Sequence, residues 1–199
     1  KTWKTESVLR LLLGIFGTLC VGILMAEGLA KLNTGWSDET TKMVSMMVVT
    51  ISFQGAALLW IRNFLKGENI SWRDAFGFNF QNPQRIIVLG MVAAIVVLPI
   101  AWGLQQLTVW VMTLRNLHPE AQQVVQELQK SVSLFQQIFL AVVALIAAPI
   151  VEEMLFRGII YPTIKRAGYP KLALWGTSIL FSLTHQNTPA FLALVFFAV

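Results

Sequence analysis

Charged residues are scarce in this chain. Asp, Glu, Lys and Arg make up 13% of its 199 residues, against about 25% in a typical soluble domain. Hydrophobic residues make up 56%, and several uncharged windows reach the roughly 20 residues that a helix needs to cross a membrane. The composition excludes an ordinary soluble domain and predicts a multi-pass integral membrane protein whose surroundings are the lipid bilayer.

Cysteine is nearly absent as well. Cys20 is the only one and lies inside an apolar stretch, so a disulfide within the chain and a thiolate metal site are both excluded. The net charge of +5 does not indicate a nucleic-acid partner, because the basic residues lie in loops between apolar stretches. There they are expected to set the topology and to contact anionic headgroups.

The apolar runs predict an all-α transmembrane helix bundle of about six spans, forming one membrane-embedded domain over residues 1–199. The chain begins with Lys1 rather than methionine, and its last apolar run stops at Val199. We therefore expect both ends to continue in a longer protein, with the last span truncated here. The expected spans are about 8–32, 42–65, 86–114, 131–163, 172–187 and an incomplete 189–199.

Three local features refine this topology. Small residues recur every four positions along the first span and predict a ridge that another helix approaches closely. Pro99 predicts a kink in the third span. The polar stretch between the third and fourth spans, with Val124, Val125 and Leu128 on one side, predicts a short helix on the membrane surface. The ridge residues are Gly14, Thr18, Gly22, Ala26 and Ala30.

The orientation follows from the loop charges. The N-terminal stretch, the 62–85 loop and the 165–171 turn carry ten Lys and Arg residues together, and the alternate loops carry four. Because positive charge favours the cytoplasmic side, the N-terminus and the 165–171 turn are predicted to be cytoplasmic.

The fourth span carries an unusual group of charges. Glu152, Glu153 and Arg157 follow a stretch from Ile138 to Val151 that has no charged residue. A charge at mid-membrane costs about 2.5–3.5 kcal/mol on the insertion scale. Three such groups are tolerable only where they face a protein interior or a wet cavity, and this placement marks a candidate functional site.

The spacing divides these residues into two roles. Glu153 and Arg157 lie four residues apart, acid before base, which is the favourable order for a helical ion pair. Glu152 lies on another side of the helix and is available for chemistry. A carboxylate in a low-dielectric setting is a stronger base near neutral pH.

A partner for this base is His185, near the end of the fifth span. Glu152 lies 16 residues before Gly168 in the connecting turn and His185 lies 17 residues after it. Consecutive helices joined by a short turn are usually antiparallel neighbours, so the two groups are expected at similar depth. Such a pair polarises a water for attack on a carbonyl; a buried Glu-Arg-His network that only ties helices together is the alternative.

Two motifs in these spans carry a family resemblance. Glu-Glu-x-x-x-Arg at Glu152, Glu153 and Arg157, followed on the next span by Phe-x-x-x-His at Phe181 and His185, resembles the CAAX protease and bacteriocin-processing family. These are intramembrane glutamic proteases related to the type II CAAX prenyl endopeptidases. The likeness covers residues 131–199, the expected catalytic core.

The resemblance implies a role for each residue. Glu152 and His185 would activate the hydrolytic water, and Glu153, Arg157 and Phe181 would support the site or bind substrate. The family's usual later His-x-x-x-Asn motif, which stabilises the oxyanion, is missing from residues 1–199. We expect it, and the rest of the core, beyond Val199.

Other hydrolase signatures are missing from the sequence. There is no His-Glu-x-x-His, Gly-x-Ser-x-Gly or Gly-x-Gly-Asp, so zinc-helix, serine and aspartyl settings are not supported. Ser178 and Ser182 are interpreted as packing or capping groups. No cofactor is expected, since Glu152 and His185 alone would be an incomplete metal site.

The sequence as a whole predicts an intramembrane endopeptidase acting on membrane-associated proteins or peptides. Two alternatives stay open at this point. One is a non-catalytic scaffold or immunity-type partner protein that uses the same residues structurally. The other is a transporter with a Glu-Arg-His relay, although no duplicated pattern of broken helices supports transport.

Overall fold

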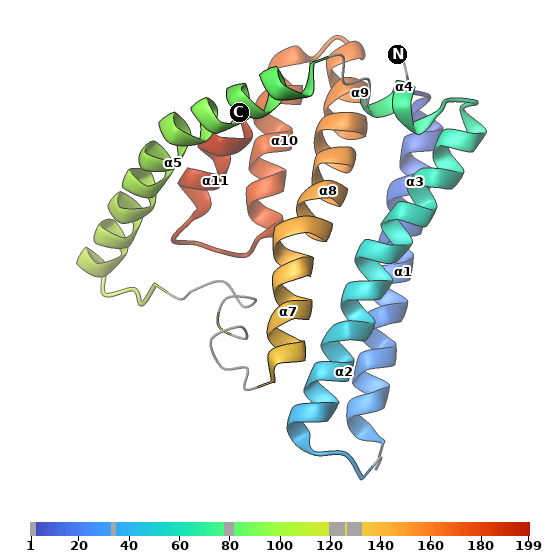
Figure 1. Ribbon diagram of the computed structural model, residues 1–199, viewed down its shortest axis with the longest axis vertical. Coiled ribbons are helices and arrows are strands. Elements are labelled where there is room, and N and C mark those ends of the chain that lie inside the picture. Colours follow the sequence, from blue (N-terminus) through green and yellow to red (C-terminus); the bar gives the residue numbers. More distant parts are fainter. Residues whose placement is uncertain (1–2, 33–34, 78–81, 120–125, 127–132) are drawn as a thin grey trace. The chain divides into compact units, whose positions relative to one another are not determined.

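The computed structural model describes residues 3–32, 35–77, 82–119, 126 and 133–199, and the regular structure in these ranges is helical (Figure 1). This confirms the all-α prediction. In chain order the elements are α1 (Thr5–Lys31), α2 (Asp38–Thr50), η1 (Ile51–Gly55), α3 (Ala56–Gly67), α4 (Trp72–Phe76), α5 (Pro83–Leu114), α7 (Leu134–Val142), η2 (Val143–Ala147), α8 (Ala148–Glu152), η3 (Glu153–Ile160), α9 (Tyr161–Arg166), α10 (Pro170–Thr184) and α11 (Phe191–Ala198).

Four continuous helices are long and apolar enough to cross a membrane: Thr5–Lys31, Asp38–Gly67, Pro83–Leu114 and Leu134–Arg166. They correspond to the first four predicted spans, and they make the chain an integral membrane protein. The later helices α10 and α11 have 15 and 8 residues, fewer than the roughly 20 that a full crossing needs.

The chain divides into two compact units. The first comprises Lys1–Phe76 and Ser131–Ile159, and the second comprises Gly77–Lys130 and Ile160–Val199. The division falls inside the helix Leu134–Arg166, between η3 and α9. That the two units form one membrane domain stays a prediction, and each is described by itself below.

In the first unit, the small residues of α1 face the helix formed by α2, η1 and α3. A Cβ added to Gly14 would lie 2.6 Å from the ring of Trp60, and one added to Gly22 would lie 2.3 Å from Cβ of Ser52. The hydroxyl of Ser45 donates to the carbonyl of Ala26 at 3.3 Å. The close helix approach predicted from the small-residue spacing is therefore confirmed.

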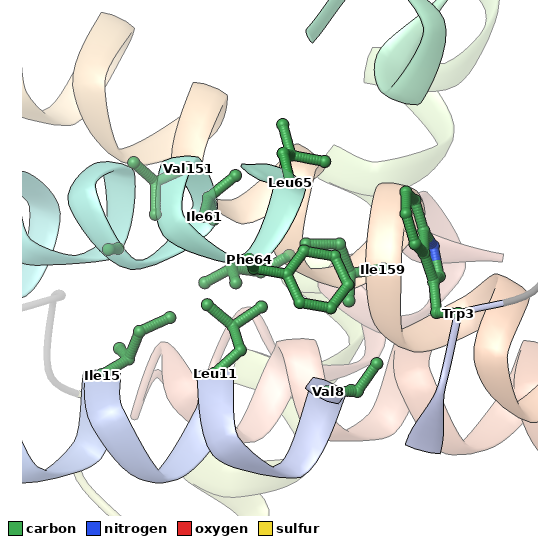
Figure 2. Close-up of a cluster of buried hydrophobic side chains, with 11 residues drawn as sticks. Trp3, Val8, Leu11, Ile15, Ile61, Phe64, Leu65, Val151 and Ile159 are labelled. Atoms are coloured by element: carbon green, nitrogen blue, oxygen red, sulfur yellow. The ribbon is translucent and has the colours of Figure 1, made fainter. Parts of the chain in front are cut away.

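The core of the first unit joins α1, α3, α8 and η3. Between helices in lipid the stabilisation comes mainly from close packing, because the acyl chains are as apolar as the side chains. The packing is tight here (Figure 2), and the five least exposed members of the cluster are Leu11, Ile61, Leu65, Val151 and Ile159.

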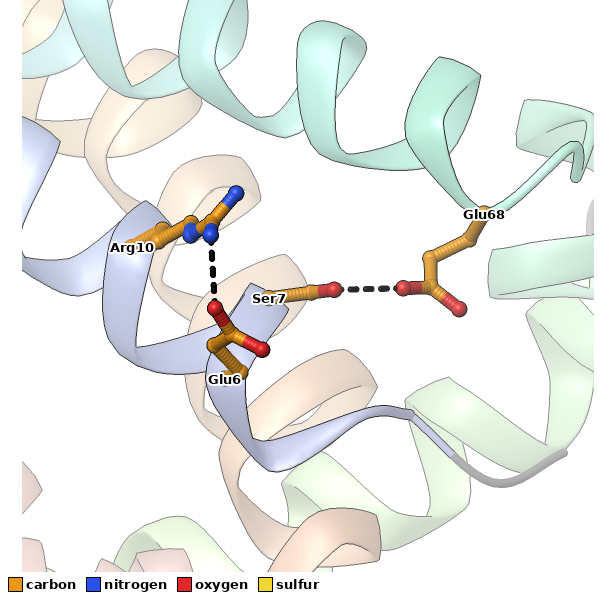
Figure 3. Close-up of polar contacts among 4 residues, drawn as sticks. All are labelled: Glu6, Ser7, Arg10 and Glu68. Carbon is orange, nitrogen blue, oxygen red and sulfur yellow. Dashed lines mark hydrogen bonds and ion pairs between the residues drawn. The ribbon is translucent and has the colours of Figure 1, made fainter.

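A polar layer lies where α1 begins and α3 ends (Figure 3). The hydroxyl of Ser7 donates to Glu68 at 2.6 Å, and Arg10 pairs with Glu6 at 2.6 Å. The rings of Trp72 and Phe76 in the following α4 are 5.7 Å apart. Aromatic and charged residues together suit the headgroup region, as the sequence predicted for this loop.

In the second unit, α10 packs against α9 and α11, and α11 packs against α5. The turn between α9 and α10 contains Gly168 with φ +96°, a left-handed conformation that glycine adopts without steric cost. The helix α5 continues through Pro99. The surface helix predicted around Val124, Val125 and Leu128 falls largely outside the described residues.

Candidate functional site

Glu152 is the last residue of α8 and Glu153 the first of η3. Their helix turns one side toward the core of the first unit, where Val151, Leu155 and Ile159 are buried. Glu152, next to Val151, is half-buried, whereas Glu153 is exposed within the protein. The core thus fixes the direction in which this helix presents Glu152.

The helix carrying the acidic motif is locally wound as a π-helix, and two prolines account for it. Pro149 and Pro162 have no backbone N–H, so the carbonyls of Leu145 and Gly158 lack their ordinary α-helical donor. Leu145 lies in η2 and Gly158 in η3. Wider turns of this kind occur frequently at functional sites. The prolines were the sequence signal for these segments, and the sequence analysis did not use it.

The carbonyl of Gly158 has a donor from elsewhere in the first unit. The indole Nε1–H of Trp3 donates to it at 3.1 Å. On Gly158 itself a Cβ would lie 2.5 Å from the ring of Phe76, so glycine allows the aromatic ring to touch the helix. Sequence reasoning missed both contacts, because nothing in the local pattern links Trp3 or Phe76 to η3.

Arg157 donates a hydrogen bond to Glu153 and forms an ion pair with it. This confirms the pairing predicted from their spacing. The side chains keep exposed fractions of 38% for Arg157 and 53% for Glu153. A pair this open in water contributes only about 0.3–0.5 kcal/mol, so its importance rests on neutralising two charges within a membrane span.

His185 lies just beyond the end of α10. The helix stops at Thr184, earlier than the predicted 187, and Gln186 takes a left-handed φ of +47°. The Nδ1 atom of His185 is 2.8 Å from the carbonyl oxygen of Phe181. A carbonyl only accepts, so Nδ1 carries the proton and Nε2 is the basic nitrogen.

The Phe-x-x-x-His motif therefore has a structural meaning. The four-residue spacing brings the backbone carbonyl of Phe181 to the imidazole of His185, and their rings lie 4.6 Å apart at 53°. Phe181 is buried. It thereby supports the imidazole twice, through its carbonyl and through its ring. An outer partner that orients a functional histidine in this way also selects the tautomer.

The two serines near His185 are bonded back into their own helix. Ser178 donates to the carbonyl of Leu174 at 2.8 Å, and Ser182 donates to that of Ser178 at 2.9 Å. Both side chains are buried, with 2% exposed. The interpretation of these serines as packing groups is confirmed.

The structure places the predicted site residues in separate units. Glu152, Glu153 and Arg157 belong to the first, and Phe181 and His185 belong to the second. The meeting of Glu152 and His185 around one water stays a prediction. Among the described ranges, no group of three or more His, Cys, Asp or Glu side chains is gathered in a metal-binding arrangement.

Residues 134–199 match the family model of the type II CAAX prenyl endopeptidases, Rce1-like. The matched segment is about a third of the chain and contains both motifs, so the family predicted from them is confirmed. Comparisons of the chain with curated proteins and with solved structures returned no match.

Proposed function

From the match of residues 134–199 to the Rce1-like type II CAAX prenyl endopeptidases, we propose that this protein is an intramembrane endopeptidase. It hydrolyses peptide bonds in proteins or peptides that are attached to the membrane or lie in it. Glu152 and His185 carry the chemistry, and no covalent enzyme intermediate forms.

One observation carries the proposal. The matched segment contains an acidic motif and a histidine motif, and the histidine is held by Phe181 with Nε2 as its basic nitrogen. A hydrolase that activates water needs such a fixed, unprotonated nitrogen or carboxylate within reach of the water. A histidine kept only for packing has no need of one particular tautomer.

In the proposed mechanism the water gives one hydrogen bond to the carboxylate of Glu152 and one to Nε2 of His185. Its lone pair then faces the scissile carbonyl carbon. Glu152 takes a proton as the water oxygen bonds to that carbon, and it gives this proton to the leaving nitrogen as the C–N bond breaks. The products are a carboxylic acid and an amine, and both residues return to their starting state.

Glu153 and Arg157 support this chemistry. Their ion pair neutralises the charges on either side of the helix turn that follows Glu152, which leaves a single unneutralised acid for the reaction. We assign the substrate-binding role to the same pair, since a guanidinium offers several donors to the carbonyls of an extended peptide.

The substrate reaches the site from the bilayer. The helix that carries Glu152 is one of the four long apolar helices, so a soluble peptide would have to leave water to reach it. We also propose that the N-terminus and the 165–171 turn face the cytoplasm, on the strength of their excess of Lys and Arg.

The test uses the full-length protein in liposomes with two fluorogenic peptides, one ending in a prenylated CAAX sequence and one anchored by an acyl chain. Cleavage is measured for wild type, Glu152→Gln and Glu153→Gln. The two variants make the same chemical change one position apart. Glu152→Gln should lose essentially all activity, whereas Glu153→Gln should keep a measurable fraction and His185→Gln should match Glu152→Gln.

Comparing the two peptides tells whether a prenyl group is recognised. Wild-type activity in Glu152→Gln would refute the assignment of the base. Wild-type protein that cleaves neither peptide and supports ion flux in the same liposomes would indicate a transporter. A partner-binding function that survives loss of His185 would indicate a scaffold.

A further inference from the structure

We propose that Trp3 is a positioning residue for the catalytic glutamate. It holds the π-helical segment η3 through the carbonyl of Gly158 and thereby sets the direction of Glu152. The inference rests on the proposed hydrolase function. It adds a residue outside the matched segment, 155 positions before its hydrogen-bond partner.

The first step is the carbonyl that Trp3 contacts. In an α-helix the carbonyl of Gly158 would accept from the N–H of residue 162, and residue 162 is a proline without one. Inside a membrane span, a backbone oxygen deprived of its donor must find another within the protein. The indole N–H of Trp3, at 3.1 Å, supplies it.

The second step is the rigidity of Trp3. Its side chain is 7% exposed and its ring lies 5.0 Å from that of Phe64 in α3, at 57°. Trp3 belongs to the same buried cluster as Val8 and Leu11 of α1. The donor is thus fixed by packing before it reaches η3, and a fixed donor defines the position of the carbonyl it binds.

The third step is a contact on the other side of Gly158. The ring of Phe76 lies so close that a Cβ on Gly158 would be 2.5 and 2.7 Å from its atoms. Trp3 and Phe76 therefore hold Gly158 from two different segments of the first unit. We call these three residues, Trp3, Phe76 and Gly158, the aromatic clamp.

The fourth step links the aromatic clamp to Glu152. Gly158 lies six residues beyond Glu152, about 9 Å along the helix axis. A π turn takes more residues than an α turn, so a change of η3 to α-helical winding would rotate Glu152 about the axis relative to Gly158. With Gly158 held by the clamp and Val151 buried in the core, that rotation is prevented.

The experiment compares Trp3→Phe with Trp60→Phe in the full-length protein. Phenylalanine keeps an aromatic ring at position 3 but has no N–H to donate. Trp60 belongs to the same unit and packs on Gly14, so it controls for the loss of an indole from this core. Two quantities are measured: amide hydrogen exchange of residues 153–160, and kcat and KM for the better of the two fluorogenic peptides.

Trp3→Phe should speed exchange across residues 153–160 and lower kcat by about ten- to hundredfold with KM unchanged, the cost typical of a small misplacement of a catalytic group. Trp60→Phe should leave both readouts near wild type. Unchanged exchange in Trp3→Phe overturns the inference, and so does faster exchange with wild-type kcat. Wild-type protein without any cleavage refutes the proposed function instead, and with it the catalytic role of Trp3, while the exchange comparison still decides whether Trp3 holds η3.

Discussion

Arg157 pairs with Glu153 one turn earlier in a membrane-spanning helix, directly after the proposed catalytic acid. The pairing explains how two adjacent glutamates in an apolar helix take different roles. One is neutralised by the arginine, and the other is kept for chemistry. The pair is also where the account is most easily tested by stability.

Arg157→Ala should destabilise the protein, because it leaves the Glu153 carboxylate in the membrane span without its cation. We expect a loss of about 1 kcal/mol or more, toward the low end for broken pairs since both side chains are partly exposed. Thermal unfolding in detergent measures it. Arg157→Ala combined with Glu153→Gln should regain stability, and a single variant that unfolds with the wild type would contradict the role of the pair.

Gly158→Ala should be destabilising, since the added methyl group would overlap the ring of Phe76. Overpacking of this kind costs about 1–3 kcal/mol. The matched measurement repeats the substitution in a Phe76→Ala background, where the ring is gone. The cost of Gly158→Ala should then shrink clearly, and an equal cost in both backgrounds would show that the two residues do not touch.

Gly22→Ala should separate α1 from its neighbour, since the new Cβ would lie 2.3 Å from Cβ of Ser52. Gly17→Ala is the control on the same helix, because a Cβ there meets nothing within 4 Å. We expect Gly22→Ala to lower the unfolding temperature. Gly17→Ala should be neutral or slightly stabilising, as alanine favours a helix over glycine by about 1 kcal/mol. Equal effects of the two changes would rule out close helix contact at Gly22.

Ser178→Ala and Ser182→Ala should both keep peptide cleavage. Each hydroxyl donates back to a carbonyl four residues earlier in α10, so neither is the nucleophile. Cleavage rates of the two variants, and of wild type treated with a serine-directed fluorophosphonate, check this. Loss of activity in a variant that still folds would point to a serine mechanism.

Much of this arrangement was predictable because it is local. Helical spans follow from runs of apolar residues, the Glu153–Arg157 pair from four-residue spacing, and the approach at Gly14 and Gly22 from small residues on one side of a helix. The motifs also identified the family, because they are short and ordered along the chain.

The remainder depends on contacts distant in sequence or on how helices end. The contact of Trp3 with Gly158 joins residues 155 positions apart; Pro162 reveals that a carbonyl lacks its donor but not where the donor comes from. The end of α10 at Thr184 follows from the left-handed Gln186, a turn that the apolar pattern does not mark. That end places His185 outside the helix proper.

The meeting of Glu152 and His185 is tested most directly by cross-linking cysteines at those two positions. Cys20→Ser removes the chain's only cysteine, and Glu152→Cys with His185→Cys then supplies the pair. Ala26→Cys with Ser45→Cys is the positive control, because these residues touch. Leu145→Cys with His185→Cys is the negative control, since Leu145 lies about 10 Å along the helix from Glu152.

We predict that a short thiol cross-linker joins positions 152 and 185 in membranes as efficiently as the touching pair, and leaves 145 and 185 unlinked. A pair at 152 and 185 that stays unlinked while the positive control reacts would contradict the shared water, and with it the proposed hydrolase.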